Sequence, residues 1–165
     1  MNVKLILKPL LLAGLLVAAS AQAAVTVKFV KSEGFADIGR WSGRPDETLK
    51  LIEEHLVAQA SKFVSGSQDL VIEVTDINLA GEEEPVGRRM DNLRVMRQIT
   101  IPTMDLTYKL SEGGKVVKEG KSHVADMSYM ERFNRYSPGD QLRFEKRMLD
   151  NWFKDEFGKT VTAAR

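Results

Sequence analysis

Three charged residues occupy positions where the alternation of a β-strand would turn their side chains toward a protein core. Asp76 and Arg97 each share the phase of the apolar residues around them, and Asp126 shares the phase of Val124. A charge carried into a core must be paired or hydrogen-bonded. Opposed carboxylate and guanidinium groups in a concave site could also act on a polar ligand. Asp76, Arg97 and Asp126 therefore predict either a polar pocket or a buried ion pair.

Arg97 is expected to pair with one of these aspartates, because its guanidinium cannot lose its proton to escape burial. The loop at 80–91 joins the segment of Asp76 to that of Arg97, so the two segments should be hairpin neighbours. Asp76 is therefore the preferred partner, with Asp126 as the alternative. A purely structural interpretation competes with this one. The aspartates would accept hydrogen bonds from loop amides, and Arg97 would pair with one of them or lie beyond a bulge.

Other sequence signals for chemistry are weak. The chain has two histidines, His55 and His123, which we expect at the surface, and no cysteine, which excludes thiol chemistry. It contains no glycine-rich phosphate loop, metal-ligand cluster or nucleophile motif. We therefore predict no catalytic residue, no cofactor and no metal site.

Two further segments are candidates for recognition. A loop carries the acidic triplet Glu82–Glu84 close to Arg88 and Arg89, and could present opposite charges or simply form a solvated hairpin tip. Phe35 and Trp41 lie in a glycine-rich irregular stretch, where they could form a binding surface or cover the end of the core.

The N-terminus has the three parts of a secretory signal peptide. Lys4 and Lys8 precede an apolar run, and an Ala-x-Ala site ends at Ala23. The run is shorter than the ~20 residues that a membrane span requires. We expect cleavage after Ala23, with Ala21 as the alternative, and a periplasmic protein without a membrane anchor. We therefore expect residues 1–23 to form the signal peptide and residues 24–165 to form one globular domain.

The composition of the processed chain limits the class of partner. Loss of Lys4 and Lys8 with the leader leaves 22 basic residues against 23 acidic ones. This balance gives no reason to expect a nucleic acid or an anionic membrane as partner. Without cysteine there is no disulfide, so stability must come from a core, which 142 residues can supply.

Hydrophobic periodicity predicts the elements that position these residues. Apolar residues recur at helical spacing over 46–64, after a cap at Asp46. A second helix is expected to begin with a Ser137 cap and Pro138 at its first position, and to stop at Gly158. Alternation predicts about five strands, which are 25–30, 70–79, 93–101, 104–110 and 116–125.

Consecutive strands joined by short turns pair antiparallel, and two amphipathic helices need one sheet face to cover. We therefore predict the α+β class, as a two-layer sandwich of a mainly antiparallel sheet with both helices on one face.

The sequence resembles a family of exported bacterial proteins known as domain of unknown function 3016. The stretches that carry the resemblance are Val25–Val30 with Phe35 and Asp37, Val74–Glu82, Ile101–Met104 with Tyr108, Ala125–Tyr129, and Glu145–Phe153. The resemblance covers nearly all of the processed chain. It implies an exported envelope protein and assigns no activity and no catalytic residue.

Two functions remain open at this point. The first is a non-catalytic binding or interaction module of the cell envelope, whose partner is an envelope protein or a small ligand. The second is a periplasmic, hydrolase-like enzyme that uses Asp76, Asp126 and Arg97. A concave pocket holding all three residues would favour the enzyme.

Overall fold

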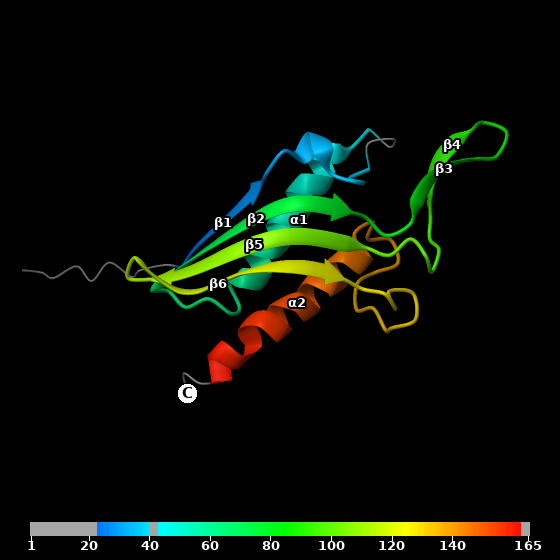
Figure 1. The fold of residues 1–165 in the computed structure, drawn as a ribbon. Coiled ribbons are helices and arrows are strands. Elements are labelled where there is room, and N and C mark those ends of the chain that lie inside the picture. Colours follow the sequence, from blue (N-terminus) through cyan, green and yellow to red (C-terminus); the bar gives the residue numbers. More distant parts are fainter. Residues whose placement is uncertain (1–22, 40–42, 163–165) are drawn as a thin grey trace, which may run out of the picture.

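The computed structural model describes residues 23–39 and 43–162. The expected signal peptide lies outside the described residues except for Ala23, and Trp41 lies outside them as well. The elements follow in the order β1 (Ala24–Phe29), η1 (Ser32–Gly34), α1 (Pro45–Ala60), β2 (Gln68–Asn78), β3 (Glu82–Val86), β4 (Asp91–Val95), β5 (Thr103–Glu112), β6 (Lys115–Ala125) and α2 (Arg143–Thr162) (Figure 1).

The main sheet has four strands in the order β1-β2-β5-β6. β1 pairs with β2 in parallel because α1 lies between them and returns the chain to the starting end of the sheet. The other pairs are antiparallel. Gly113 and Gly114 close the β5–β6 turn with φ values of 56° and 78°, in the left-handed region that a tight hairpin turn requires. The expected α+β class with a mainly antiparallel sheet is confirmed.

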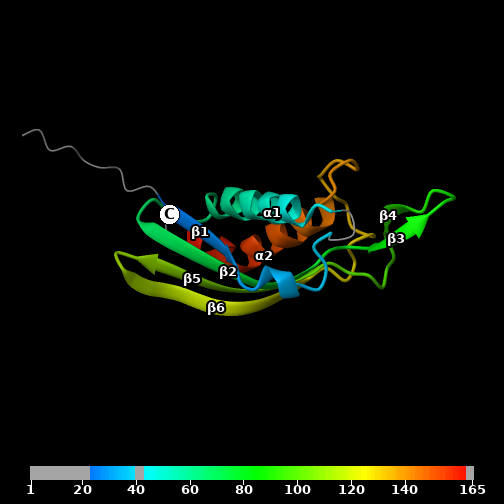
Figure 2. The same ribbon diagram turned by 90° about the horizontal axis from the view of Figure 1, so that it is seen from above.

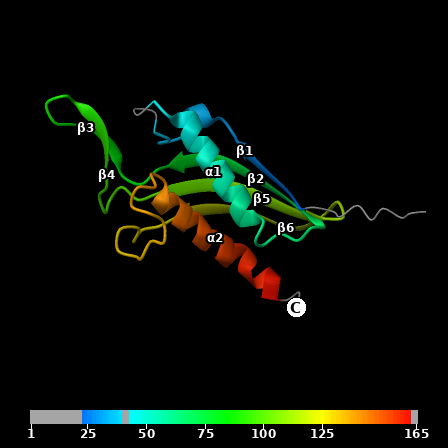
Figure 3. The same ribbon diagram turned by 180° about the vertical axis from the view of Figure 1, so that it is seen from behind.

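Both helices cover the same face of this sheet (Figures 2 and 3). Alternate residues of β2 and β5, among them Ile72, Val74 and Leu106, are buried beneath them. Trp152 and Phe153 of α2 are buried, as their helical spacing predicts, and the Trp152 indole donates to Ser122 Oγ at 3.1 Å. Within the described residues, no helix is long and apolar enough to cross a membrane.

The expected strand over 93–101 is wrong in its extent and in its partner. β4 ends at Val95 and pairs with β3, so the two form a separate hairpin that projects beyond one end of the main sheet (Figure 1). The chain then turns at Arg97, where Thr100 donates its amide to the Arg97 carbonyl. β5, whose inward residues are all apolar, takes the place beside β2. The hairpin residue Leu93 stays exposed, as does Ile99 in this turn.

The helix boundaries also differ from those predicted. α1 begins at Pro45 with Arg44 as its N-cap, in place of Asp46. α2 begins at Arg143, because Ser137 and Asp140 each accept a hydrogen bond from the amide two residues on, which forms turns instead of helix. Gly158 does not stop α2, which continues to Thr162.

Candidate functional site

Arg97 does not reach the aspartate that its predicted strand position assigned to it. Its guanidinium pairs with the Glu84 carboxylate, with 2.9 Å from Nη2 to Oε2, and its side chain is 42% exposed. The predicted Asp76–Arg97 ion pair is therefore wrong. Arg97 lies beyond the end of β4, so the alternation that turned it inward does not apply to it.

Asp76 serves a local structural purpose. Its Oδ1 accepts the Ala36 amide at 2.8 Å, which ties the segment after β1 to β2. The register of β2 against β5 shifts between Val74 and Asp76, and this bulge resets the phase of the strand. The half-buried Asp76 therefore matches the competing structural interpretation.

Asp126 is buried, and its partner is a residue that the sequence argument missed. Arg147 of α2 places Nη2 at 2.7 Å from Asp126 Oδ2. The same guanidinium donates to the carbonyls of Tyr129, Arg132 and Phe133. Asp76, Arg97 and Asp126 thus have three separate sets of partners and do not form one site.

His55 is not a surface residue, in contrast to the prediction. Its side chain is 9% exposed, and Nε2 lies 3.0 Å from Asp150 Oδ1 and 3.1 Å from the Lys146 carbonyl oxygen. Both neighbours are acceptors, so Nε2 carries the proton and donates it. His55 therefore links α1 to α2 and is not poised as a base through this nitrogen. His123 is exposed, as predicted, and lies 2.7 Å from Asp105.

Asp150 is the buried acceptor at the centre of this link. Tyr136 also donates to it at 2.8 Å, and Arg135 forms an ion pair with it. Burial alone would raise the pKa of Asp150, but the hydrogen bonds from His55 and Tyr136 and the charges of His55 and Arg135 hold it below its ordinary value. Asp150 therefore remains a carboxylate.

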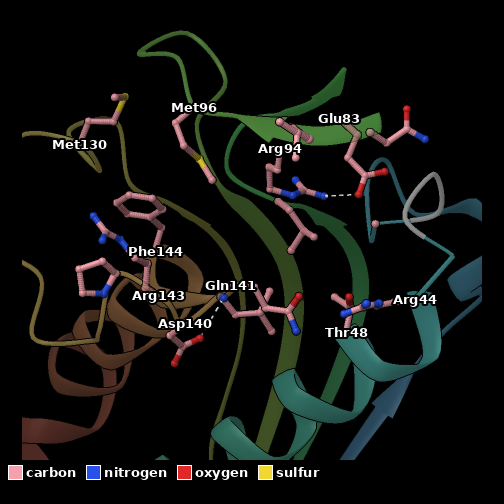
Figure 4. Close-up of a pocket in the computed structure, with 16 residues that line it drawn as sticks. Arg44, Thr48, Glu83, Arg94, Met96, Met130, Asp140, Gln141, Arg143 and Phe144 are labelled. Atoms are coloured by element: carbon pink, nitrogen blue, oxygen red, sulfur yellow. Dashed lines mark hydrogen bonds and ion pairs between the residues drawn. The ribbon is translucent and has the colours of Figure 1, made fainter. Parts of the chain in front are cut away.

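A pocket of about 810 Å³ lies between the β3–β4 hairpin and the first turns of α1 and α2 (Figure 4). This volume is in the range typical of small-molecule sites. Apolar side chains form much of its wall, namely Leu79, Leu93, Met96, Met130, Leu142 and Phe144. Uncharged polar side chains also line it, namely Thr48, Asn92 and Gln141.

Two charged groups of this pocket, Arg94 and Asp140, are held by other residues of the protein itself. Arg94 donates to Asp37 Oδ2 at 3.0 Å and to the Ala80 carbonyl at 3.1 Å. Figure 4 shows the same guanidinium directed toward Glu83, at 3.6 Å. Asp140 pairs with Lys146 at 2.6 Å. Arg94 and Asp140 are therefore fixed and neutralised before any ligand arrives.

Glu145 lies next to this wall and is fully buried. Its Oε1 accepts the Ala80 amide at 2.7 Å, while Oε2 is buried with no hydrogen-bond partner among the described residues. Burial raises the pKa of the Glu145 carboxyl, and the Ala80 amide offsets this only in part. Ala80 thus links α2 to Arg94, because its amide donates to Glu145 of α2 and its carbonyl accepts from Arg94.

Sequence reasoning missed Arg94, Glu145 and Arg147. Glu145 was visible only as a polar interruption in the apolar stripe of α2. The other two carried no sequence signal, because their partners lie 11 or more positions away in the chain. Across residues 23–39 and 43–162, no three histidine or acidic side chains are grouped in a way that could hold a metal ion.

The fold and the pocket define a small α+β protein with a side pocket of mixed polar and apolar lining, in which Arg94 and Asp140 are internally paired. A family described as protein of unknown function (DUF3016) matches residues 23–155. The chain belongs to this family, which confirms the resemblance seen in the sequence. No curated protein matches the chain.

Proposed function

We propose that this protein is an exported binding module of the cell envelope, and that its ligand occupies the pocket between the β3–β4 hairpin and the two helices. The observation that carries the proposal is the pocket itself, a concavity of about 810 Å³ with a mixed polar and apolar lining, in which Arg94 and Asp140 are already held in position. Polar groups that are fixed in advance lower the ordering cost of binding. The leader-like N-terminus supports export to the periplasm.

The chemistry of the wall favours a ligand with an apolar body and uncharged hydrogen-bonding groups. Arg94 is paired with Asp37, and Asp140 is paired with Lys146. Neither of these two residues therefore needs an opposite charge from a ligand. Asn92 and Gln141 carry amides, and Thr48 carries a hydroxyl, all of which suit peptide groups. An extended peptide segment with apolar side chains satisfies both requirements.

Binding is favoured over hydrolysis by the placement of the candidate catalytic residues. Asp76, Arg97 and Asp126 do not line this pocket, and each has a different partner. Arg94 is one of three arginines that line the pocket, with Arg44 and Arg143, and it already donates to a carboxylate and a carbonyl. We therefore place the function in recognition, with no chemical step assigned.

Export is tested by fractionation of cells that produce the full chain, followed by N-terminal sequencing. The protein should appear in the periplasmic fraction with the sequence Ala24-Val25-Thr26 at its start. A protein that retains Met1 and stays with the cytoplasmic fraction would refute the localisation.

Ligand binding is tested by selecting peptides on the purified protein from a random display library and measuring their affinity by calorimetry. Leu93→Trp, in the pocket wall, should lower the affinity of the selected peptides at least tenfold. Val86→Trp is the matched control, because Val86 is exposed on the same hairpin but does not line the pocket. Equal loss in both variants, or no selected peptide, would contradict the proposed site.

A further inference from the structure

The connection between β6 and α2, residues 126–142, presents three apolar side chains to solvent. Met127 is 80% exposed, Met130 is 46% exposed and Phe133 is 89% exposed. The connection lies at the same end of the molecule as the β3–β4 hairpin (Figures 1 and 3). Exposed apolar side chains gathered in one short segment are typical of a surface that contacts a membrane or another protein.

The backbone of this connection is anchored by contacts with α2 and with Arg97. Arg147 binds the carbonyls of Tyr129, Arg132 and Phe133. The Tyr129 ring is buried at 4.8 Å from the Phe144 ring, and its hydroxyl donates to the Arg97 carbonyl at 2.7 Å. The exposed side chains are therefore carried by an anchored backbone, so presenting them requires no ordering.

Basic residues surround a hollow of about 370 Å³ beside Phe133. Arg132, Arg135, Arg147 and Lys154 line it, together with Asp150 as its acidic residue. Arg147 is neutralised by Asp126, and Asp150 is held by Arg135 and His55. Arg132 and Lys154 are exposed and have no ion pair among the described residues. The acidic residue Glu131 lies in the same connection, but its carboxylate accepts a hydrogen bond from Gln98. The hollow therefore carries a local positive charge.

We propose that Met127, Met130 and Phe133, with Arg132 and Lys154, form a docking surface that seats the protein on an anionic lipid membrane. The apolar side chains would enter the interface between headgroups and acyl chains, and the two cations would meet lipid phosphates. The near-zero net charge of the whole chain does not oppose this, because screening limits each charge to about 10 Å. The local cluster decides the interaction.

The size of the apolar cluster favours lipid over a protein partner. A phenylalanine offers about 150–250 Å² of surface. With its two methionines, Phe133 provides on the order of half of the ~800 Å² that each partner gives to a stable protein interface. Insertion of a few side chains into a bilayer surface needs no complementary protein face.

The test is vesicle flotation of the processed protein, recovered from cells that export it and with its N-terminus sequenced. Vesicles of phosphatidylcholine with 30% phosphatidylglycerol are compared with vesicles of phosphatidylcholine alone. We expect binding to the anionic vesicles only, with affinity falling as salt rises. Neutralising a basic residue near an anionic surface costs about fivefold in affinity. Arg132→Gln with Lys154→Gln should therefore lower the partition coefficient about 25-fold, and Phe133→Ser should lower it at least tenfold.

The matched controls lie away from the docking surface. Val117→Ser removes an exposed apolar side chain near the β5–β6 turn, and Lys121→Gln removes an exposed cation from β6. Both should bind like the parent protein, and all variants should keep its thermal midpoint. Equal binding to both vesicle types, no vesicle binding, or equal effects of control and test variants would overturn the proposal. The Leu93→Trp variant should float normally, so this test can fail independently of the peptide site.

Discussion

Arg147 Nη2 lies 2.7 Å from Asp126 Oδ2, and both side chains are buried. The pair joins the end of β6 to the second turn of α2, and the same guanidinium holds three carbonyls of the segment between them. One side chain thus fixes the connection that borders the pocket and carries the proposed docking surface. The pair therefore has consequences for both stability and binding.

Loss of this arginine should be among the more costly single changes. Arg147→Ala strands a buried carboxylate, so we expect the free energy of unfolding to fall by about 3–5 kcal/mol. The double change Arg147→Ala with Asp126→Ala should cost at least ~1 kcal/mol less than the sum of the single changes Arg147→Ala and Asp126→Ala, because the stranded charge is gone. Urea unfolding of the four proteins measures the coupling. Additive single and double changes would show that the pair is not coupled.

Arg97→Ala should behave in the opposite way, because its partner Glu84 remains in water when the pair is broken. We expect the thermal midpoint to stay within experimental error of the parent protein. Thermal unfolding followed by circular dichroism checks this. A large loss of stability would mean that Arg97 is buried, as its strand pattern first indicated.

The buried Glu145 predicts a particular pH dependence. Its native pKa lies above the ordinary value of 4.5 because of burial, so the folded state binds its proton more tightly than the unfolded state does. The contribution of Glu145 to stability is therefore full at low pH and declines as the pH rises through 4.5 toward the raised native pKa.

Glu145→Gln should remove this decline while an amide oxygen still accepts the Ala80 amide. The stability of the variant relative to the parent should increase from pH 4 to pH 7, by no more than about 1.4 kcal/mol per pH unit. Urea unfolding across this range measures the difference. Glu131→Gln, at an exposed carboxylate, is the control and should run parallel to the parent. A parallel curve for Glu145→Gln would show that Glu145 titrates normally.

Gly158→Ala distinguishes the observed α2 from the one that the sequence predicts. Gly158 lies inside the helix, its φ is outside the left-handed region, and an added Cβ meets nothing within 4 Å. Alanine should therefore raise the free energy of unfolding by about 0.5–1 kcal/mol. Gly113→Ala, at φ 56°, should lower it, and thermal unfolding of both variants measures this contrast. A destabilised Gly158→Ala would restore Gly158 as the residue that ends the helix.

Patterns of neighbouring residues predicted most of the fold. Strict alternation identified β5 and β6, the glycine pair identified their turn, and the apolar stripe of α2 placed Trp152 and Phe153 in the core. These signals are local, because strand and helix periodicity depend on residues a few positions apart. The α+β class follows from the order of such elements, so it could be determined from the sequence alone.

The partners of the charged residues were decided by the tertiary structure. A bulge before Asp76 and a turn at Arg97 reset phases that alternation had assumed to be continuous. The packing of α2 beside the sheet brings Arg147 to Asp126 and Glu145 to Ala80. The packing of α2 beside α1 brings His55 to Asp150. An ion pair between distant segments depends on ångström-scale placement of two backbones, which no periodicity encodes. The sequence therefore determined the two helices and the strands of the main sheet, whereas the tertiary structure decided the separate β3–β4 hairpin, which charges meet and where the pocket opens.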